Sequence, residues 1–262
     1  MKRTKLELSR ENILFPAEFA EFTNSCDIYD SSCSTEARVF FIDKDGGYYL
    51  KCSGKGALEK EALMAEYFAS KKLTSEFMGY VSCEKDWMMT RKVNGEDGTH
   101  AQYLSEPEKL CDLYALSLRE LHETDHSDCP IQNRTADYLE SARRGYEEGK
   151  FDTRLFSEPF FKDGNEAWEY LTSHSKMLKC DTLIHGDYCL PNIIFEGGKR
   201  SGFIDLGNGG VGDRHIDIFW GVWSLWFNLK TDKYTDRFFD AYGRDKTDPD
   251  VLKVIASAEV FG

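Results

Sequence analysis

The chain has 262 residues, of which 41% are hydrophobic, 14% aromatic and 30% charged. This composition excludes an intrinsically disordered chain and is typical of a globular protein long enough to bury a core without disulfides or structural metals. The formal net charge of −13 disfavours nucleic acid and membrane surfaces as partners and suits a polycationic ligand, although an excess of surface carboxylates also serves solubility.

Segments that would direct the chain out of the cytoplasm are not recognisable. The longest uncharged run, residues 218–229, has 12 residues, fewer than the roughly 20 that cross a bilayer, so we expect a buried helix there. No apolar stretch follows the basic first residues, so we expect no signal peptide. The 8 cysteines lack regular spacing, which predicts reduced thiols in a cytoplasmic protein.

Residues 1–93 are predicted to form a small antiparallel sheet with one helix. Residues 37–42 and 48–52 are predicted strands that flank a turn and form a hairpin. Residues 57–72 contain neither Gly nor Pro and repeat apolar residues at helical spacing. Further strands are predicted at 78–83 and 87–93, and the Asn94-Gly95 turn marks the expected domain boundary.

Residues 94–262 are predicted to form a larger, mainly helical part. The expected helices span residues 107–123, 135–148, 165–177, 215–229, 234–241 and 249–260. Short strands are expected at 182–184, 192–195 and 201–205. The spacing of Trp220, Trp223 and Trp226 at every third residue favours a buried helix face over a ligand platform.

The loop after residues 182–184 carries the most specific chemical pattern. Asp187 and Asn192 lie five residues apart, and Asp205 follows 13 residues after Asn192 at the end of an apolar strand. Asp187 can accept a hydroxyl proton, whereas Asn192 and Asp205 offer oxygens suited to Mg²⁺. Each residue alone is typical of a turn, but the ordered set predicts a base and a metal site for phosphoryl transfer.

Residues 185–192 and 201–207 resemble the catalytic and metal-binding loops of the aminoglycoside phosphotransferase family, particularly its 3′-phosphotransferases. The resemblance covers roughly residues 39–261. It implies a two-lobed protein-kinase-like α+β fold, with a nucleotide-binding lobe at residues 1–93 and a catalytic, acceptor-binding lobe at 94–262. It also implies the roles of four residues: Asp187 as catalytic base, His185 as support of the loop, and Asn192 and Asp205 as magnesium ligands.

The expected nucleotide site begins with a lysine and a glutamate. Lys51 ends a predicted strand, and Glu61 lies on the next helix, with Glu59 as its near competitor. Such a pair positions the phosphates in kinase-like folds. Tyr49 matches the position at which the family stacks an aromatic ring on the nucleobase, although a half-buried strand tyrosine needs no such role.

Two further segments complete this expected site. Residues 31–36, with Ser34 and Thr35, either cup a phosphate without glycine or form a plain polar turn. Residues 89–93, with Arg91 and Val93, are expected to be the hinge whose backbone bonds the base.

The acceptor side departs most from the family. The resemblance implies acceptor contacts from an acidic loop around Glu158 and from the tail residues Glu259 and Phe261, which Gly262 extends by one residue. The segment that usually carries an antibiotic-binding arginine is uncharged here and contains Trp223, which the acceptor could contact. Asn208 stands where the family often has arginine.

The expected function is transfer of the γ-phosphate of ATP or GTP, with Mg²⁺, to a hydroxyl of an aminoglycoside, in the 3′ position by the resemblance. Such an enzyme would confer antibiotic resistance. Two alternatives stay open: a kinase for another small hydroxylated compound, such as another antibiotic, a sugar or an amino alcohol, and a nucleotide-binding protein without turnover.

Overall fold

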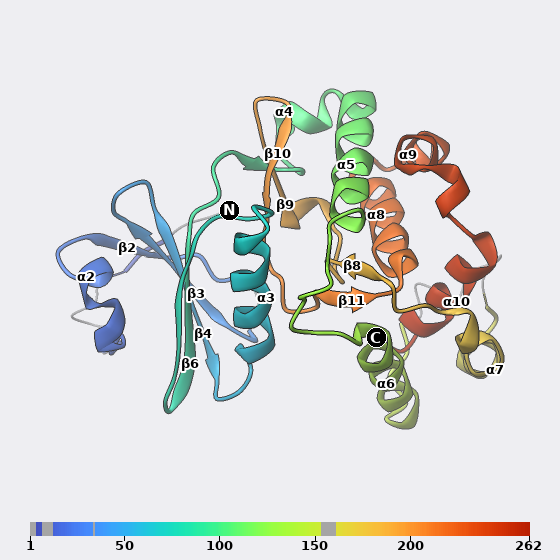
Figure 1. Cartoon of the computed structure of the whole chain (residues 1–262), viewed down its shortest axis with the longest axis horizontal. Helices are drawn as coiled ribbons and strands as arrows, with labels where there is room; N and C mark the ends of the chain where they lie inside the picture. Colours follow the sequence, from blue (N-terminus) through green and yellow to red (C-terminus); the bar gives the residue numbers. More distant parts are fainter. Residues whose placement is uncertain (1–3, 7–12, 34, 153–160) are drawn as a thin grey trace. The chain divides into compact units, whose positions relative to one another are not determined.

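The structure is a computed structural model that describes residues 4–6, 13–33, 35–152 and 161–262. It is an α+β protein in two compact units (Figure 1). The first comprises Met1–Asn94 and Ser201–Gly207, and the second comprises Gly95–Arg200 and Asn208–Gly262. Within the described part of the chain, no helix has the length and apolar run that crossing a membrane requires.

The first unit is built on an antiparallel sheet with the order β1-β2-β3-β4-β6-β5. Its strands are β1 (Thr4–Lys5), β2 (Asp27–Asp30), β3 (Arg38–Asp43), β4 (Tyr48–Gly54), β5 (Phe77–Ser82) and β6 (Lys85–Arg91). The predicted hairpin is confirmed, since β3 pairs with β4 in antiparallel register. The helical segments are η1 (Ala17–Phe19), α2 (Ala20–Thr23) and α3 (Glu59–Ser70).

Strand β4 presents different side chains to its two faces, as the period of two requires. Tyr48, Leu50 and Cys52 are buried in one apolar core with residues of the neighbouring strands. Tyr49 and Lys51 alternate with them and therefore lie on the opposite face. This alternation places the Lys51 side chain on the face of the sheet where it contacts Glu61 of α3.

Residues 201–207 correct the predicted organisation, which placed them with the helical part. Backbone amide Phe203 N donates to Leu73 O at 3.0 Å, and the Thr74 hydroxyl donates to Phe203 O at 2.6 Å. These bonds attach the segment to the first unit. The reason escapes sequence reasoning, because the partners are about 130 positions apart.

The second unit consists mainly of helices. They are α4 (Ala101–Leu104), α5 (Pro107–His122), α6 (Arg134–Glu147), α7 (Gly164–His174), α8 (Arg214–Leu229), α9 (Thr235–Tyr242) and α10 (Pro249–Glu259), with the short turns η3 (Ser175–Met177), η4 (Leu190–Asn192) and η5 (Arg244–Lys246). Helix α8 packs against α5, α9 and α10. The predicted helices are confirmed to within a few residues, whereas α4 was not predicted.

Short strands in the second unit hold the loop that carries Asp187. Strand β8 (Thr182–Ile184) pairs with β11 (Gly210–Gly212), and β9 (Ile193–Glu196) pairs with β7 (Glu96–Asp97). Strand β10 (Lys199–Phe203) follows β9 through the turn at Gly197 and Gly198, and its last three residues belong to the first unit. The loop between β8 and β9 is therefore fixed at both of its ends.

Candidate active site

Lys51 is the centre of the candidate site in the first unit. Its ammonium Nζ lies 2.9 and 2.8 Å from the two carboxylate oxygens of Glu61, and 3.0 Å from Oδ1 of Asp205. Burial acts to lower the pKa of Lys51, but the negative charges of Glu61 and Asp205 outweigh it and raise that pKa above its ordinary value. The ammonium is therefore charged at neutral pH and can bind phosphate oxygens. Glu59 is not its partner.

Asp205, two residues after the end of β10, adopts an unusual backbone conformation. Its φ of +61° places it in the left-handed region, which asparagine and aspartate enter more readily than other residues with a Cβ. Its side chain is 55% exposed, and Oδ1 accepts from Lys51. Backbone strain of this kind concentrates at functional sites, and here it presents a carboxylate beside the ammonium of Lys51.

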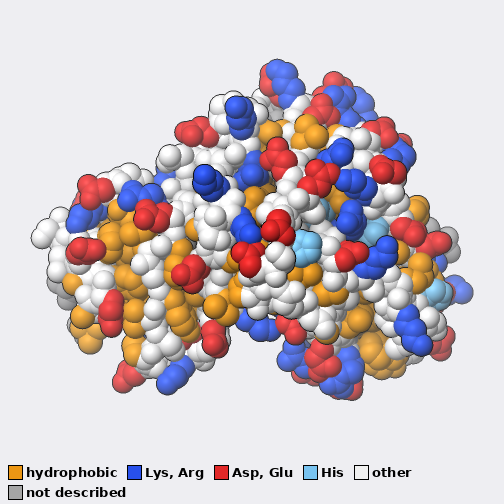
Figure 2. Space-filling model, viewed as in Figure 1, with side chains coloured by type: hydrophobic (Ala, Val, Ile, Leu, Met, Phe, Trp, Pro, Cys, Tyr) orange, Lys and Arg blue, Asp and Glu red, His pale blue; other side chains and the backbone are white. Residues whose placement is uncertain are grey.

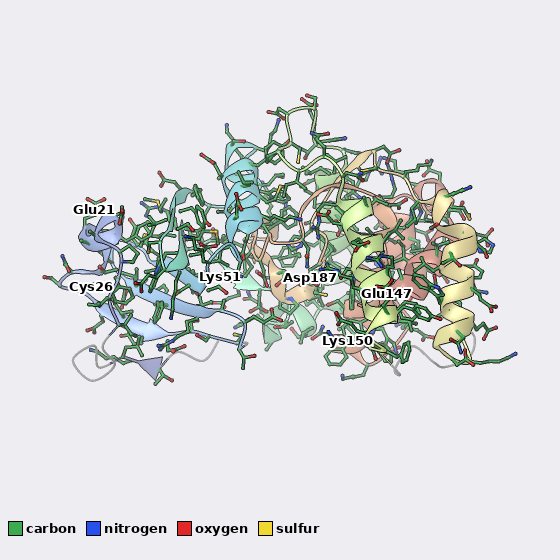
Figure 3. The ribbon with its side chains drawn as sticks, turned by 90° about the horizontal axis from the view of Figure 1, so that it is seen from below. Glu21, Cys26, Lys51, Glu147, Lys150 and Asp187 are labelled. Atoms are coloured by element: carbon green, nitrogen blue, oxygen red, sulfur yellow. The ribbon has the colours of Figure 1, made fainter. Side chains whose placement is uncertain are left out.

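The loop from His185 to Asn192 forms the candidate site in the second unit; Figure 3 labels Asp187. The Asn192 side-chain amide donates to Asp187 Oδ2 at 2.8 Å and to its backbone carbonyl at 3.0 Å. The amide of Cys189 also donates to that carbonyl, at 2.8 Å. Asn192 does not bind the other carboxylate oxygen, Oδ1, although the Cys189 thiol also interacts with this carboxylate. Asn192 keeps its own Oδ1, which accepts no hydrogen bond within the described residues.

His185 supports this loop and does not face solvent. Its side chain is fully buried, and its Nδ1 accepts a hydrogen bond from the backbone amide of Asp187 at 3.3 Å. Gly186, between them, has a φ of +80°, and an added Cβ would lie 2.0 Å from the carbonyl oxygen of Asn208. Only glycine fits there, because both the conformation and the space exclude a side chain.

Asp217 on α8 anchors the loop, a role that the sequence analysis did not assign. It is completely buried, and its two oxygens accept from the backbone amides of His185 and Gly186, both at 2.7 Å. Its Oδ2 also lies 3.1 Å from Nε2 of His122. Burial lowers the pKa of His122, so its neutral ring donates to Asp217 through Nε2 and accepts from the Tyr242 hydroxyl, 2.8 Å away, through Nδ1.

Two tyrosines and a serine hold the rest of the loop. The Tyr114 hydroxyl on α5 donates to the carbonyl of Tyr188 at 2.6 Å, and the Tyr188 hydroxyl donates back to the carbonyl of Tyr114 at 2.8 Å. Their rings stack with centroids 4.6 Å apart. The backbone amide of Leu190 donates to the Ser224 hydroxyl on α8 at 2.9 Å. The loop backbone is therefore tied to two helices.

Arg134 is a second residue that sequence reasoning missed. Its guanidinium donates to the carbonyl and to the side-chain oxygen of Asn208, both at 3.0 Å. The resemblance led us to note Asn208 as a departure, and the structure shows that an arginine of α6 approaches this position. The contact fixes the backbone that closes over Gly186.

The other residues predicted to bind the nucleotide differ in burial and in the hydrogen bonds that their backbone amides make. Tyr49 is half-buried, and its ring packs at 5.4 Å on that of Phe41. Thr35 is exposed, whereas Ser34 lies outside the described residues. The amide of Arg91 already donates to Glu76 O, which excludes it as the donor to a base. The amide of Val93 has no partner within the described segments and stays available.

The structure corrects the predictions for Phe261 and for the row of tryptophans on α8, whereas the acceptor roles of Glu158 and Trp223 stay predictions. Glu158 lies outside the described residues. Phe261 is 2% exposed, with its ring packed on those of Tyr146 and Trp168, so it belongs to the core and cannot present its ring to a ligand. The predicted buried helix face formed by Trp220, Trp223 and Trp226 is also wrong, because the side chain of Trp226 is 49% exposed. Three residues per step advance about 300° around a helix, so the third indole leaves the buried side.

Glu259 is buried between two helices. Its Oε1 accepts from the Tyr138 hydroxyl at 2.8 Å and from the Trp220 indole at 2.9 Å. Burial raises the pKa of Glu259 from 4.5 to about 7, and the charge of Asp187 adds to that rise. The carboxyl is therefore partly neutral at physiological pH.

This burial predicts a pH-dependent stability. Because the folded-state pKa exceeds the unfolded one, the folded chain keeps a proton that the unfolded chain releases between pH 4.5 and 7. The contribution of Glu259 is therefore fully present below pH 4.5 and is lost as the pH rises through 7, by about 3 kcal/mol in total. Replacing Glu259 with glutamine keeps an acceptor oxygen for both hydrogen bonds. We expect Glu259→Gln to flatten the dependence of the urea unfolding free energy on pH in this window.

The exposed Glu169 on α7 serves as the matched control. Glu169→Gln is expected to retain the slope of the wild-type chain. An unchanged slope in Glu259→Gln would show that Glu259 ionises as readily in the folded chain as in the unfolded one.

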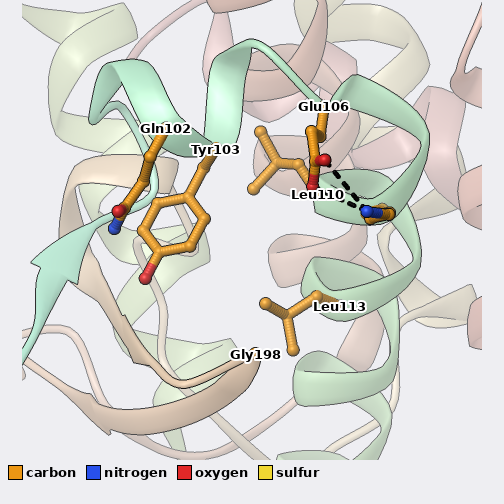
Figure 4. A pocket seen from close by; sticks show the side chains of 7 residues that line it. Gln102, Tyr103, Glu106, Leu110, Leu113 and Gly198 are labelled. Atoms are coloured by element: carbon orange, nitrogen blue, oxygen red, sulfur yellow. Dashed lines mark hydrogen bonds and ion pairs between the residues drawn. The ribbon is translucent and has the colours of Figure 1, made fainter.

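A separate groove on the second unit does not belong to this site (Figure 4). It is lined by the side chains of Gln102, Tyr103, Glu106, Lys109, Leu110 and Leu113, and by Gly198. Its two charged groups pair with each other, since Lys109 Nζ lies 2.9 Å from the Glu106 carboxylate. The groove offers no uncompensated charge for a phosphate or a polycation. The same mixing of charges holds for the face in Figure 2, where acidic and basic side chains are interspersed.

Comparisons with known proteins identify the family of this chain. The family model for the phosphotransferase enzyme family matches residues 34–255. A probable aminoglycoside 3′-phosphotransferase of Lactococcus lactis is 46% identical over 99% of this chain and 100% of its own length. An aminoglycoside 3′-phosphotransferase of Niallia circulans is 32% identical over 67% of each chain.

Solved structures share the fold. The crystal structure of an aminoglycoside 3′-phosphotransferase of type VIII superposes with a TM-score of 0.71 at 19% identity, covering 94% of this chain and 100% of its own. An aminoglycoside phosphotransferase from Streptomyces rimosus, in complex with ADP and streptomycin, gives a TM-score of 0.65 at 21% identity over 86% of this chain and 91% of its own. The chain therefore belongs to the aminoglycoside phosphotransferase family and is an enzyme.

Proposed function

We propose that this enzyme transfers the γ-phosphate of ATP to the 3′-hydroxyl of an aminoglycoside antibiotic and so confers resistance on its host. The observation that carries the proposal is Lys51, a charged ammonium held by Glu61 and Asp205 within 3.0 Å. The 46% identity with the Lactococcus lactis relative supports the acceptor class and the position. The first unit binds the nucleotide, and the second provides the base and the acceptor site.

The described residues offer oxygen ligands that fit Mg²⁺. Asp205 presents a half-exposed carboxylate, and Asn192 presents a side-chain oxygen without a hydrogen-bond partner in the described chain. Mg²⁺ prefers one or two such ligands together with phosphate oxygens and water. We propose Asp205 and Asn192 as its ligands; when bound, the ion neutralises charge on the phosphates.

Asp187 performs the proton transfer in this proposal. The acceptor oxygen attacks the γ-phosphorus, the bond to the bridging oxygen of the leaving nucleoside diphosphate breaks, and the hydroxyl proton passes to the carboxylate of Asp187. Asn192 keeps that carboxylate oriented through Oδ2. Lys51 binds the phosphates and keeps Glu61 as its counter-charge. Positioning and electrostatics supply most of the rate enhancement.

The experiment that tests the function compares two acceptors that differ in one hydroxyl. The purified enzyme is given ATP and Mg²⁺ with kanamycin or with its 3′-deoxy analogue, and ADP release and product mass are measured. We expect phosphorylation of kanamycin alone. Equal turnover of the 3′-deoxy compound would overturn the position, and turnover of an uncharged alcohol alone would replace the acceptor class. Substituting GTP for ATP tests the choice of nucleotide.

A variant of Asp205 tests the proposed metal ligand. Asp205→Ala removes the carboxylate and also one partner of Lys51, so we expect nucleotide affinity to lose its dependence on Mg²⁺ concentration. Calorimetric titration with ADP, with and without Mg²⁺, measures this independently of turnover. Asp43→Ala, at an exposed carboxylate of β3, is the control. A full magnesium dependence in Asp205→Ala would assign the metal to other ligands.

A further inference from the structure

Asp86, on strand β6, is a buried carboxylate of the first unit that has no part in the site described above. Its side chain has no solvent-exposed surface. Trp87 and Met89 of the same strand belong to the apolar core on one face of the sheet. Because side chains alternate along a strand, Asp86 lies on the opposite face, where Lys51 contacts α3. A carboxylate is costly to bury without partners, so its hydrogen bonds show what it holds in place.

The carboxylate of Asp86 binds the backbone at the start of α3. Its Oδ2 accepts from the amide of Leu58 at 3.0 Å, and its Oδ1 accepts from the Ser82 hydroxyl of β5 at 2.7 Å. The backbone of Gly56 provides a further hydrogen bond. Burial acts to raise the pKa of Asp86, but these hydrogen bonds outweigh it and hold that pKa below its ordinary value. Asp86 is therefore ionised at neutral pH and joins β5, β6 and α3.

Helix α3 needs this cap because its own N-cap residue cannot supply one. Leu58 occupies that position and has no polar side-chain atom. The first amides of a helix have no partner within the helix and carry a partial positive charge, so a carboxylate suits them. The connection from β4 is loose: residues 54–57 are exposed. A Cβ added at Gly54 or Gly56 would meet nothing within 4 Å in the described part of the chain, apart from its neighbours in sequence.

The first turn of α3 also carries Glu61, the partner of Lys51. Glu61 is the third residue of the helix, so it lies within one turn of Leu58. On the strand side the path is equally short. Asp86 pairs with Ser53 in the register of β4 and β6, and Ser53 follows Lys51 by two residues. Asp86 therefore connects the strand that carries the lysine to the helical turn that carries the glutamate.

Apolar packing alone would define this geometry poorly. Met64, Ala65 and Phe68 are buried on the inner face of α3, but apolar contacts have no preferred direction and resist sliding along the helix axis less than a hydrogen bond does. The two oxygens of Glu61 lie 2.9 and 2.8 Å from Lys51 Nζ. A slide of about 1 Å would take them out of hydrogen-bond range. A directional bond at the first turn opposes that slide.

We propose that Asp86 is a positioning residue for nucleotide binding, which fixes the first turn of α3 against the sheet so that Glu61 holds Lys51 in place for the phosphates. The inference rests on the proposed function only for the role of Lys51 in binding phosphate. Asp86 acts on the phosphates through the other two residues and not directly. Its effect on nucleotide affinity therefore depends on the carboxylate of Glu61.

Calorimetric titration of the purified full-length enzyme with ADP and Mg²⁺ tests this dependence as a double-mutant cycle. We expect Asp86→Asn to weaken ADP binding about tenfold, because its amide turns a donor toward the amides that start α3. In the Glu61→Gln background, the same change is expected to alter the dissociation constant less than about twofold. Ile42→Val, in the core on the other face of the sheet, is the control. It is expected to lower the midpoint of urea unfolding and to keep wild-type affinity.

Ser82→Ala is the milder variant, which decides the question if Asp86→Asn does not fold. It removes one donor to Asp86, and we expect it to weaken ADP binding about two- to fivefold, again only while Glu61 is present. Wild-type affinity in folded Asp86→Asn, or in Ser82→Ala where it stands in, would overturn the inference. An equal loss of affinity in both backgrounds would also overturn it, since a general loss of stability does not depend on Glu61.

The same titrations separate this inference from the proposed function. Wild-type enzyme that binds no ADP would overturn both. A positive double-mutant cycle in an enzyme that does not phosphorylate the 3′-hydroxyl of kanamycin would support the role of Asp86 and overturn the proposed reaction alone.

Discussion

Replacing Asp187 with asparagine is expected to lower kcat by about 10²- to 10⁴-fold, because the variant cannot accept the hydroxyl proton. The asparagine side chain has nearly the same shape as aspartate. It still offers an oxygen to the amide of Asn192, which in the wild-type chain donates to Asp187 at 2.8 Å. Nucleotide affinity is expected to stay at the wild-type level, since the base acts on the acceptor.

Steady-state kinetics with kanamycin and calorimetric titration with ADP measure these two effects separately. Asp245→Asn, at a carboxylate of η5 near the C-terminal helix, makes the same chemical change away from the loop and serves as the control. Near-normal turnover in purified Asp187→Asn would contradict the mechanism, and loss of ADP binding would place Asp187 in the nucleotide site.

The second large effect is expected at Asp217. Its carboxylate accepts two backbone amides at 2.7 Å and the His122 ring at 3.1 Å while completely buried. Asp217→Asn turns one acceptor oxygen into a donor that faces other donors. Each buried donor left unpaired costs about 1–3 kcal/mol, so we expect a loss of roughly 3 kcal/mol or more in the free energy of unfolding. Because His185 and Gly186 lead into Asp187, we also expect kcat to fall at least about tenfold.

Asp213→Asn provides a matched comparison for this result. Asp213 is also buried at the start of α8, but its oxygens accept from Lys179 and His215 and not from the loop. Urea unfolding is expected to show that both variants are destabilised, whereas kcat at a temperature where both remain folded should fall only in Asp217→Asn. Equal kcat values would reduce Asp217 to a purely structural role.

The sequence predicted the local features of this protein better than the long-range ones. The hairpin of β3 and β4, the helix α3 with Glu61, and the ends of α8 follow from turn residues and periodicity, which act within a few residues. The pairing of Lys51 with Glu61 could be expected because the strand and helix are adjacent in the chain. Its third partner, Asp205, was predicted only as a metal ligand.

The residues that hold the loop could not be found in the same way. Asp217 follows Gly186 by 31 positions, and Arg134 precedes Asn208 by 74. No spacing rule links such residues, because tertiary packing alone brings them together. The prediction that the three tryptophans of α8 form a buried face was wrong for a different reason. Periodicity shows which residues share a helix face, but it does not show how wide the buried part of the helix is.

The reciprocal bonds between Tyr114 and Tyr188 have a consequence for the dynamics of the loop. Segments between strands usually open locally at little cost, and their amides exchange with solvent long before the core does. Here Tyr188 is fully buried and shares two hydrogen bonds with α5. We therefore expect the loop to open together with that helix rather than by itself. Its amides are expected to exchange as slowly as those of α5, and a protease is expected to cleave elsewhere in the chain first.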